Sequence, residues 1–247
     1  MGIWRDLFWS SVGKKFISGL TGLFLVVFVV AHLAGNFTLL IGGDAFNEYA
    51  HFIESLAHGW VLPVFEVGLA TVFILHILSG ASVALIDKYR ARPVRYAVSA
   101  NAGHTSRKGI SSRTMIISGL VLLIFVIAHV IMFRFGDARL VPAGNGGAGG
   151  HGEMRDLYAL VVQAFKQEAV TAGYVAVMIV LGIHLRHGFW SAFQSLGWTR
   201  AGSVGSLTTL ALVIAILLAV GFLLLPVYIY AFADPPAALQ AAGGGGQ

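Results

Sequence analysis

The chain carries little charge and no cysteine. Only 11% of its 247 residues are charged and 57% are hydrophobic, whereas soluble domains contain about 25% charged residues. Because so much apolar surface cannot be buried in one aqueous core, the composition predicts an integral membrane protein. The absence of cysteine excludes disulfides, covalent haem attachment through a C-x-x-C-H motif, and thiolate ligands for an iron–sulfur cluster.

Five apolar runs are long enough to cross a bilayer, which takes roughly 20 helical residues. We predict spans at about 16–41, 62–86, 114–133, 169–193 and 207–231. Each span must be a helix, because no water is present in the bilayer to satisfy its backbone groups. The predicted fold is therefore all-α, with a polytopic membrane domain over residues 1–232 and a flexible exterior tail over 233–247.

The positive charges lie between the spans and mostly on one side. The N-terminal segment, the loop between the second and third spans, and the end of the fourth span with the loop after it carry 12 of the 16 Lys and Arg residues. The remaining four lie at the opposite side of the membrane, between the third and fourth spans. The positive-inside rule then puts the N-terminus in the cytoplasm and the C-terminus outside. Because membrane topology explains the net charge of +5, we expect no nucleic-acid partner.

Four histidines interrupt the apolar runs, one in each of the first four spans: His32, His76, His129 and His184. At about 1.5 Å per helical residue, His32 and His129 both lie roughly 25 Å from the cytoplasmic flank. His76 lies roughly 18 Å from that flank, and His184 falls in the same inner half. We therefore define an outer pair, His32 with His129, and an inner pair, His76 with His184.

Two imidazoles at matching depth on separate helices can ligate the iron of one haem from both sides. Two such pairs predict two stacked haems in a four-helix bundle, with the fifth helix outside it. Without cysteine the haems would be b-type. Glycines such as Gly22 and Gly119 would let a porphyrin approach the helices, although small residues also serve ordinary helix packing.

A haem-free proton transporter with a histidine relay is the alternative from another class, since single intramembrane histidines often bond helices together or relay protons. No Asp or Glu lies in the middle of a span to complete such a relay. The transporter would be colourless when purified, whereas a haem protein would not.

Several motifs together resemble the cytochrome b membrane subunit of succinate dehydrogenases and fumarate reductases, in its single-subunit, di-haem, five-helix form. They are "SGLTGLFLVVFVVAHLAGN", "FNEYAHFIE", "SSRTM…SGL" and "HLRHGFWSAFQSLG". The resemblance covers residues 1–232, and the four histidines fall in the family's order.

The resemblance implies a non-catalytic electron-transfer subunit of succinate dehydrogenase in the bacterial cytoplasmic membrane. Such a subunit anchors a flavoprotein with FAD and an iron–sulfur protein. It transfers electrons through two b haems to or from a quinone, usually menaquinone. The whole complex is expected to form dimers or trimers in the lipid bilayer.

The resemblance also assigns residue roles. It pairs the first span with the third and the second with the fourth, as the depth count does. The outer pair would ligate a low-potential haem and the inner pair a high-potential one. Glu54, in the first exterior loop and 22 residues after His32, would exchange protons with the quinone. Glu66 is the alternative candidate for that role. Haem propionates need cationic or hydroxyl partners. The candidates near the inner face are Ser18, Thr21, Arg113 and Arg186. Ordinary anchoring at the membrane interface explains these residues equally well.

The cytochrome b of a hydrogenase or formate dehydrogenase stays open as a further alternative, because it would differ mainly in its partner. A cytochrome bc pattern, with two ligands about four turns apart on each of two helices, is not met. The residues 14 positions after His76 and His184 are Arg90 and Trp198.

Overall fold

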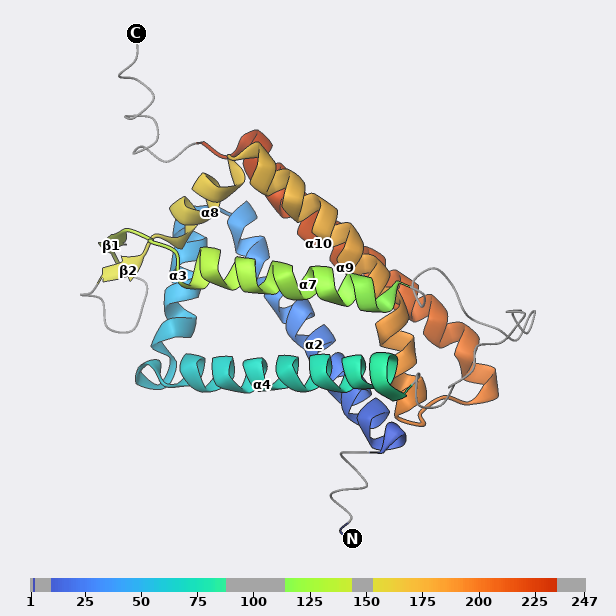
Figure 1. The fold of residues 1–247 in the computed structure, drawn as a ribbon. Coiled ribbons are helices and arrows are strands. Elements are labelled where there is room, and N and C mark those ends of the chain that lie inside the picture. Colours follow the sequence, from blue (N-terminus) through green and yellow to red (C-terminus); the bar gives the residue numbers. More distant parts are fainter. Residues whose placement is uncertain (1, 3–9, 88–113, 144–152, 235–247) are drawn as a thin grey trace. The chain divides into compact units, whose positions relative to one another are not determined.

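The computed structural model of the chain describes residues 2, 10–87, 114–143 and 153–234 (Figure 1). Within these residues, five helical segments are long and apolar enough to cross a membrane. They are Ser11–Leu40, Val61–Asp87, Met115–Arg134, Glu168–Ser195 and Val204–Phe232. The predicted all-α class with five spans is confirmed, and each predicted boundary lies within a few residues of the observed one. The predicted tail lies outside the described residues from position 235 onward.

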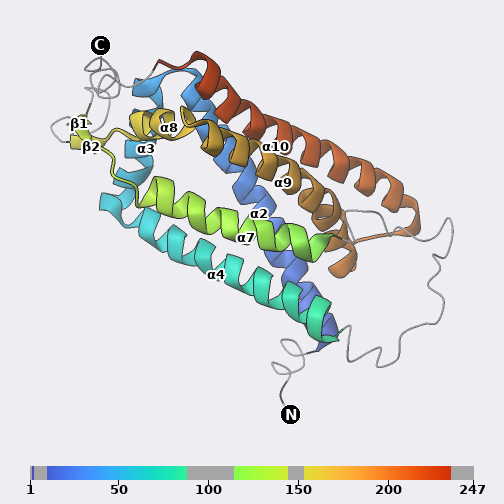
Figure 2. The ribbon, with the colours of Figure 1, turned by 45° about the horizontal axis from the view of Figure 1, so that its top comes forward.

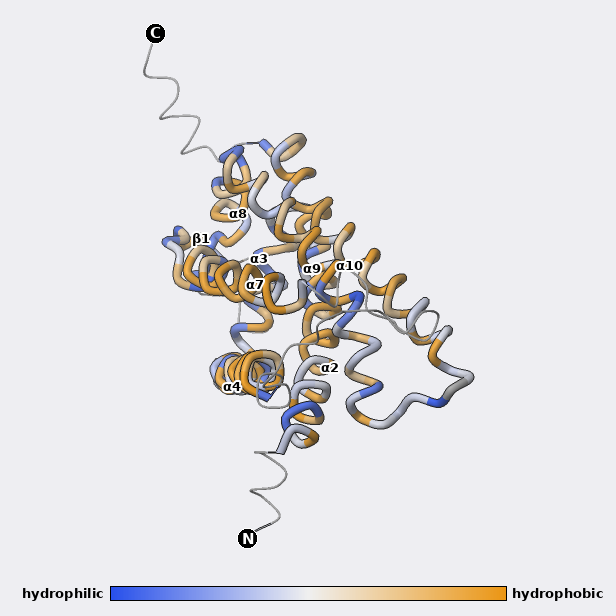
Figure 3. Tube along the Cα trace, turned by 45° about the vertical axis from the view of Figure 1, so that its right-hand side comes forward, coloured by the Kyte–Doolittle hydropathy of each residue, from blue (hydrophilic) through white to orange (hydrophobic). Residues whose placement is uncertain are grey.

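The long helices are α2 (Ser11–Asn36), α4 (Val61–Ala81), α7 (Met115–His129), α9 (Glu168–Ser195) and α10 (Val204–Phe232). A 3₁₀ turn (Phe37–Leu40) extends α2, and π-helical turns extend α4 (Ser82–Asp87) and α7 (Val130–Arg134). Figure 3 shows that the long helices are mainly hydrophobic. α10, which was expected outside the bundle, is the most deeply buried of the five.

Two further helices and two strands were not predicted. The segment between the first two spans contains a helix, α3 (Gly43–Ser55), which a 3₁₀ turn (Leu56–Gly59) joins to α4. A short helix, α8 (Leu157–Phe165), precedes α9. Two three-residue strands, β1 (Leu140–Pro142) and β2 (Glu153–Arg155), pair antiparallel beside α3 and α8 (Figure 2).

Two prolines occupy positions that membrane helices tolerate. Pro63 is the third residue of α4, where a backbone N–H has no acceptor inside the helix. Pro226 lies inside α10 and therefore removes the donor that the carbonyl of Phe222 would otherwise receive. Neighbouring groups can satisfy such a carbonyl in a membrane bundle, so α10 continues through the proline.

The chain forms two compact units, and every long helix contributes residues to both. Unit 1 comprises Met1–Val29, Gly68–Val121 and Val180–Leu217, and unit 2 comprises Val30–Val67, Leu122–Ile179 and Leu218–Gln247. Unit 1 contains His76 and His184, and unit 2 contains His32 and His129. Each predicted histidine pair therefore belongs to one compact unit.

In unit 1, an ion pair and a close helix approach connect the long helices. Lys14 Nζ lies 2.9 Å from Asp87 Oδ1, with side chains 12% and 14% exposed, so the pair joins the start of α2 to the end of the second span. Farther along α2, a Cβ added at Gly19 would lie 3.2 Å from the carbonyl oxygen of Ala192 and 3.2 Å from Ser195 Cβ. Glycine at this position therefore lets α2 pack directly on the α9 backbone.

In unit 2, side chains from the 3₁₀ turn after α2 and from α8 and α10 form an apolar core. Val162 and Ile229 are fully buried at its centre, and its remaining members are Leu39, Val161, Phe165 and Ala233. This unit thus has a packed core of its own, built partly from the short helix that the sequence did not predict.

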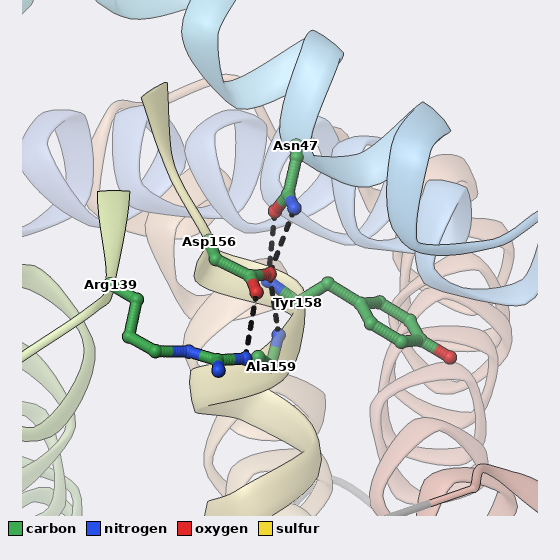
Figure 4. A network of polar contacts seen from close by, with 5 residues as sticks. All are labelled: Asn47, Arg139, Asp156, Tyr158 and Ala159. Carbon is green, nitrogen blue, oxygen red and sulfur yellow. Dashed lines mark hydrogen bonds and ion pairs between the residues drawn. The ribbon is translucent and has the colours of Figure 1, made fainter. Parts of the chain in front are cut away.

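A polar network fixes α3 against α8 (Figure 4). Asn47 Nδ2 donates to Asp156 Oδ1 over 3.0 Å, and Asn47 Oδ1 accepts from the backbone N–H of Tyr158 over 2.9 Å. Asp156 also caps α8 by accepting from the Ala159 N–H over 3.1 Å, and it contacts Arg139 Nη2 at 3.5 Å. This network holds the helix that carries Glu54.

We expect Gly19→Leu to destabilise the protein, because its side chain would press against the α9 backbone. Overpacking of this kind costs about 1–3 kcal/mol. Gly173→Leu is the matched control, since no atom lies within 4 Å of a Cβ placed there. Thermal unfolding in detergent should show a lower midpoint for Gly19→Leu alone. Equal midpoints for the two variants would show that the α2–α9 approach is not close.

Candidate functional site

The outer pair lies together in unit 2. The ring centroids of His32, on α2, and His129, on α7, are 5.8 Å apart with planes at 89°. Phe222 of α10 lies 5.9 Å from the His32 ring, and Phe125 stacks on His129 at 5.6 Å. The fifth long helix therefore supplies one wall of this site, contrary to the expectation that it lies outside the bundle.

The His129 ring is held from α9. Its Nδ1 lies 3.1 Å from the Tyr174 hydroxyl oxygen. The Tyr174 O–H donates to Met132 Sδ over 4.0 Å. The Tyr174 oxygen accepts from His129 in this bond when the ring carries its proton on Nδ1.

The inner pair lies in unit 1, and α2 holds its first member. His76 Nδ1 lies 3.2 Å from the Ser18 carbonyl oxygen and 3.3 Å from Thr21 Oγ1. The Thr21 hydroxyl donates to the Ile17 carbonyl over 2.6 Å. Since a carbonyl can only accept, the proton of the neutral His76 ring is on Nδ1.

α7 holds the second member of the inner pair. His184 Nδ1 lies 3.0 Å from Ser118 Oγ, and the Ser118 hydroxyl donates to the Met115 carbonyl over 3.0 Å. The serine oxygen is thereby left to accept from Nδ1–H of His184. His184 and His76 belong to the same compact unit.

Three of the four rings thus have Nδ1 close to an oxygen on a neighbouring helix. With the ring proton on Nδ1, Nε2 carries the lone pair. Metal-ligating histidines characteristically use their other nitrogen in this way. Imidazoles bonded at about 2 Å to opposite sides of one metal ion have centroids roughly 6 Å apart, close to the 5.8 Å of the outer pair. The residues therefore fit a group that takes one imidazole on each face.

A bare metal ion fits less well than haem. Over residues 10–87, 114–143 and 153–234, the structure contains no cluster of three or more His, Cys, Asp or Glu side chains that could hold a metal ion. Haem iron needs only two ligands from protein because the macrocycle supplies the others. The pairs therefore match the ligand count of haem.

Two glycines make room for the imidazoles. A Cβ added at Gly22 would lie 3.1 Å from His76 Cε1, and one added at Gly119 would lie 3.5 Å from His184 Cε1. In the structure these glycines thus face histidine rings of the inner pair. These two glycines therefore leave room for the rings of His76 and His184.

The predicted propionate partners fall in different places. Ser18 and Thr21 lie beside His76, where the Ser18 carbonyl and the Thr21 hydroxyl contact the ring. Arg186 is exposed on α9, and Arg113 lies outside the described residues. Ser18 and Thr21 therefore support a histidine in the structure.

Both candidate proton carriers, Glu54 and Glu66, lie near Arg134. Arg134 Nε and Nη2 lie 2.5 Å and 3.4 Å from the two carboxylate oxygens of Glu66. Glu54, half-buried near the end of α3, is close enough to Arg134 for their charges to interact. Glu66 therefore forms a two-point ion pair with Arg134, with Glu54 nearby on α3.

Sequence reasoning missed the side chains that support the histidines. Ser118 and Tyr174 each place a hydroxyl group inside an apolar span, the same kind of signal that identified the histidines. Phe222 gave no signal, because one phenylalanine among many apolar residues is ordinary in a membrane helix.

Two curated proteins are similar to the chain. One is the succinate dehydrogenase cytochrome b558 subunit of Bacillus subtilis, 24% identical over 193 residues, which cover 77% of this chain and 83% of that protein. The other is the succinate dehydrogenase hydrophobic membrane anchor subunit of Halobacterium salinarum, 33% identical over 89 residues, which cover 35% of this chain and 63% of that protein. No protein-family model and no solved structure matches the chain.

We expect Gly22→Val to displace the His76 ring, because its side chain would occupy the position next to His76 Cε1. Purified protein should lose the absorption of one haem and keep that of the other. Gly68→Val on α4 is the control, since nothing lies within 4 Å of a Cβ there. Unchanged pigment in Gly22→Val would contradict the close approach of His76 to α2.

Proposed function

We propose, from the distant homology of most of this chain to the succinate dehydrogenase cytochrome b558 subunit, that it is the membrane-anchor cytochrome b subunit of a succinate:quinone oxidoreductase. It would carry two b haems between an iron–sulfur partner and a quinone. The chain performs no substrate chemistry on succinate, which belongs to a flavoprotein partner with FAD.

One observation carries the haem assignment. Each compact unit contains two of the histidines, and His76, His129 and His184 each have Nδ1 against an oxygen of a neighbouring helix. A proton relay needs rings that can exchange protons at both nitrogens, whereas rings that donate from Nδ1 to these oxygens would present Nε2 to a metal. The arrangement therefore favours ligation over the haem-free transporter.

The chain's own residues would hold and shield two haems. The outer pair would ligate one haem between α2 and α7, with Phe125 and Phe222 excluding water from its ligands. The inner pair would ligate the other between α4 and α9, with Thr21 and Ser118 fixing the rings. When bound, each haem supplies an iron that takes up and releases one electron.

A quinone would exchange protons near the exterior end of unit 2. Glu54 would pass a proton between its carboxylate oxygen and an oxygen of the quinone. Glu66 would keep Arg134 in place through their two-point ion pair. Menaquinone is the expected substrate, and the N-terminus and the docking face for the partner subunits would be cytoplasmic, as the positive-inside rule indicates.

Single histidine replacements test the ligand pairs. His129→Leu should abolish the outer haem and His184→Leu the inner haem, so that each variant keeps about half of the pigment and loses a different component in a redox titration. His51→Gln, in α3, is the control and should keep both haems. If both ligand replacements removed the same component, or neither removed any, the proposed pairing would be wrong.

A charge-neutral replacement tests the proton carrier. Glu54→Gln should lower quinone turnover by roughly 100-fold, the scale of a lost acid–base group, while both haems stay bound. Glu48→Gln removes a carboxylate from the same helix at an exposed position and should be without effect. The assignment fails if Glu66→Gln abolishes turnover and Glu54→Gln does not.

A further inference from the structure

Tyr174 is a half-buried phenol among aromatic rings at the outer pair. Its ring lies 4.9 Å from Phe125 and 4.9 Å from Phe165, both edge-to-face, and 6.1 Å from Phe133. Its hydroxyl reaches His129 Nδ1 at 3.1 Å and Met132 Sδ at 4.0 Å. Surrounding rings therefore fix the phenol in one orientation, with its oxygen against a histidine.

Each supported histidine has a different kind of acceptor. His76 donates to a backbone carbonyl, His184 to an aliphatic hydroxyl and His129 to a phenol. A hydrogen bond donated from Nδ1 raises the basicity of Nε2, and second-shell bonds of this kind tune the potential of a bound metal. Different acceptors can thus set the two sites to different potentials.

The direction of the Tyr174 bond follows from the proposed ligation of iron by Nε2 of His129. With Nε2 on the metal, the proton of the neutral ring is on Nδ1, so the Tyr174 oxygen accepts, and its own O–H lies 4.0 Å from Met132 Sδ. Both Met132 and Tyr174 lie in the same unit as the outer pair, so the relay Met132–Tyr174–His129 is complete within one compact part of the fold.

We propose, in an inference that rests on the proposed function, that Tyr174 is a positioning residue for the outer haem. Through the hydrogen bond from His129, it fixes the ligand tautomer and lowers the midpoint potential of the iron that His129 would bind. Buried polar groups are usually hydrogen-bonded for stability alone. A purely structural phenol would leave the potential unchanged.

The test uses the whole complex purified from the membrane and titrated optically, with the haem g-values recorded by electron paramagnetic resonance. Tyr174→Phe keeps the aromatic ring and removes only the oxygen. The midpoint potential of the haem that is lost in His129→Leu should rise, and its g-values should change. The other haem should keep its midpoint potential and its g-values. Ser118→Ala should shift the opposite haem, the one lost in His184→Leu.

Tyr228→Phe is the matched control, because Tyr228 also lies in unit 2 but packs on Phe232, and it should move neither haem. Loss of only the outer haem from Tyr174→Phe would also support the proposal. Unshifted potentials, equal shifts of both haems, or loss of both would overturn it. A wild-type complex without haem would overturn the proposed function itself, and this inference with it.

Discussion

The hydrogen bond from an imidazole Nδ1 to an oxygen on a neighbouring helix is the interaction on which this structure depends. An imidazole in a hydrocarbon environment is costly unless its polar atoms are satisfied. His76, His129 and His184 meet this need at one nitrogen only, through Ser18 and Thr21, Tyr174 and Ser118. The same bond leaves the other nitrogen for the iron ligation proposed above, so that one contact would serve both stability and the proposed site.

This constraint explains the packing around the pairs. An oxygen can reach Nδ1 only if the helices approach closely, and glycine at positions 22 and 119 allows the ring to lie against the facing backbone. At the exterior end, α3 and α8 are fixed to each other through Asn47 and Asp156, which holds Glu54 in the same unit as the outer histidines. The fold thus collects the ligands, their supports and a candidate proton carrier without long polar segments inside the spans.

The spans and the depth of each histidine could be predicted because both are properties of one helix and its own flanking charges. The partners of the histidines could not, since they depend on how each helix is rotated about its axis. α4 and α10 are strongly apolar and do not gather their few polar residues on one face, so no polar face indicated that rotation. For the same reason, the burial of α10 and its contact through Phe222 were missed. The pairing of Glu66 with Arg134 was also missed, because it joins residues 68 positions apart in the sequence. The helix α3 lay in a segment that was interpreted only as a loop.

Quantifying haem in the purified subunit complex tests the central claim most directly. We expect two haem b groups per chain, each low-spin with two imidazole ligands by electron paramagnetic resonance. A colourless chain, or haem in which imidazole binds on one side only, would contradict the account.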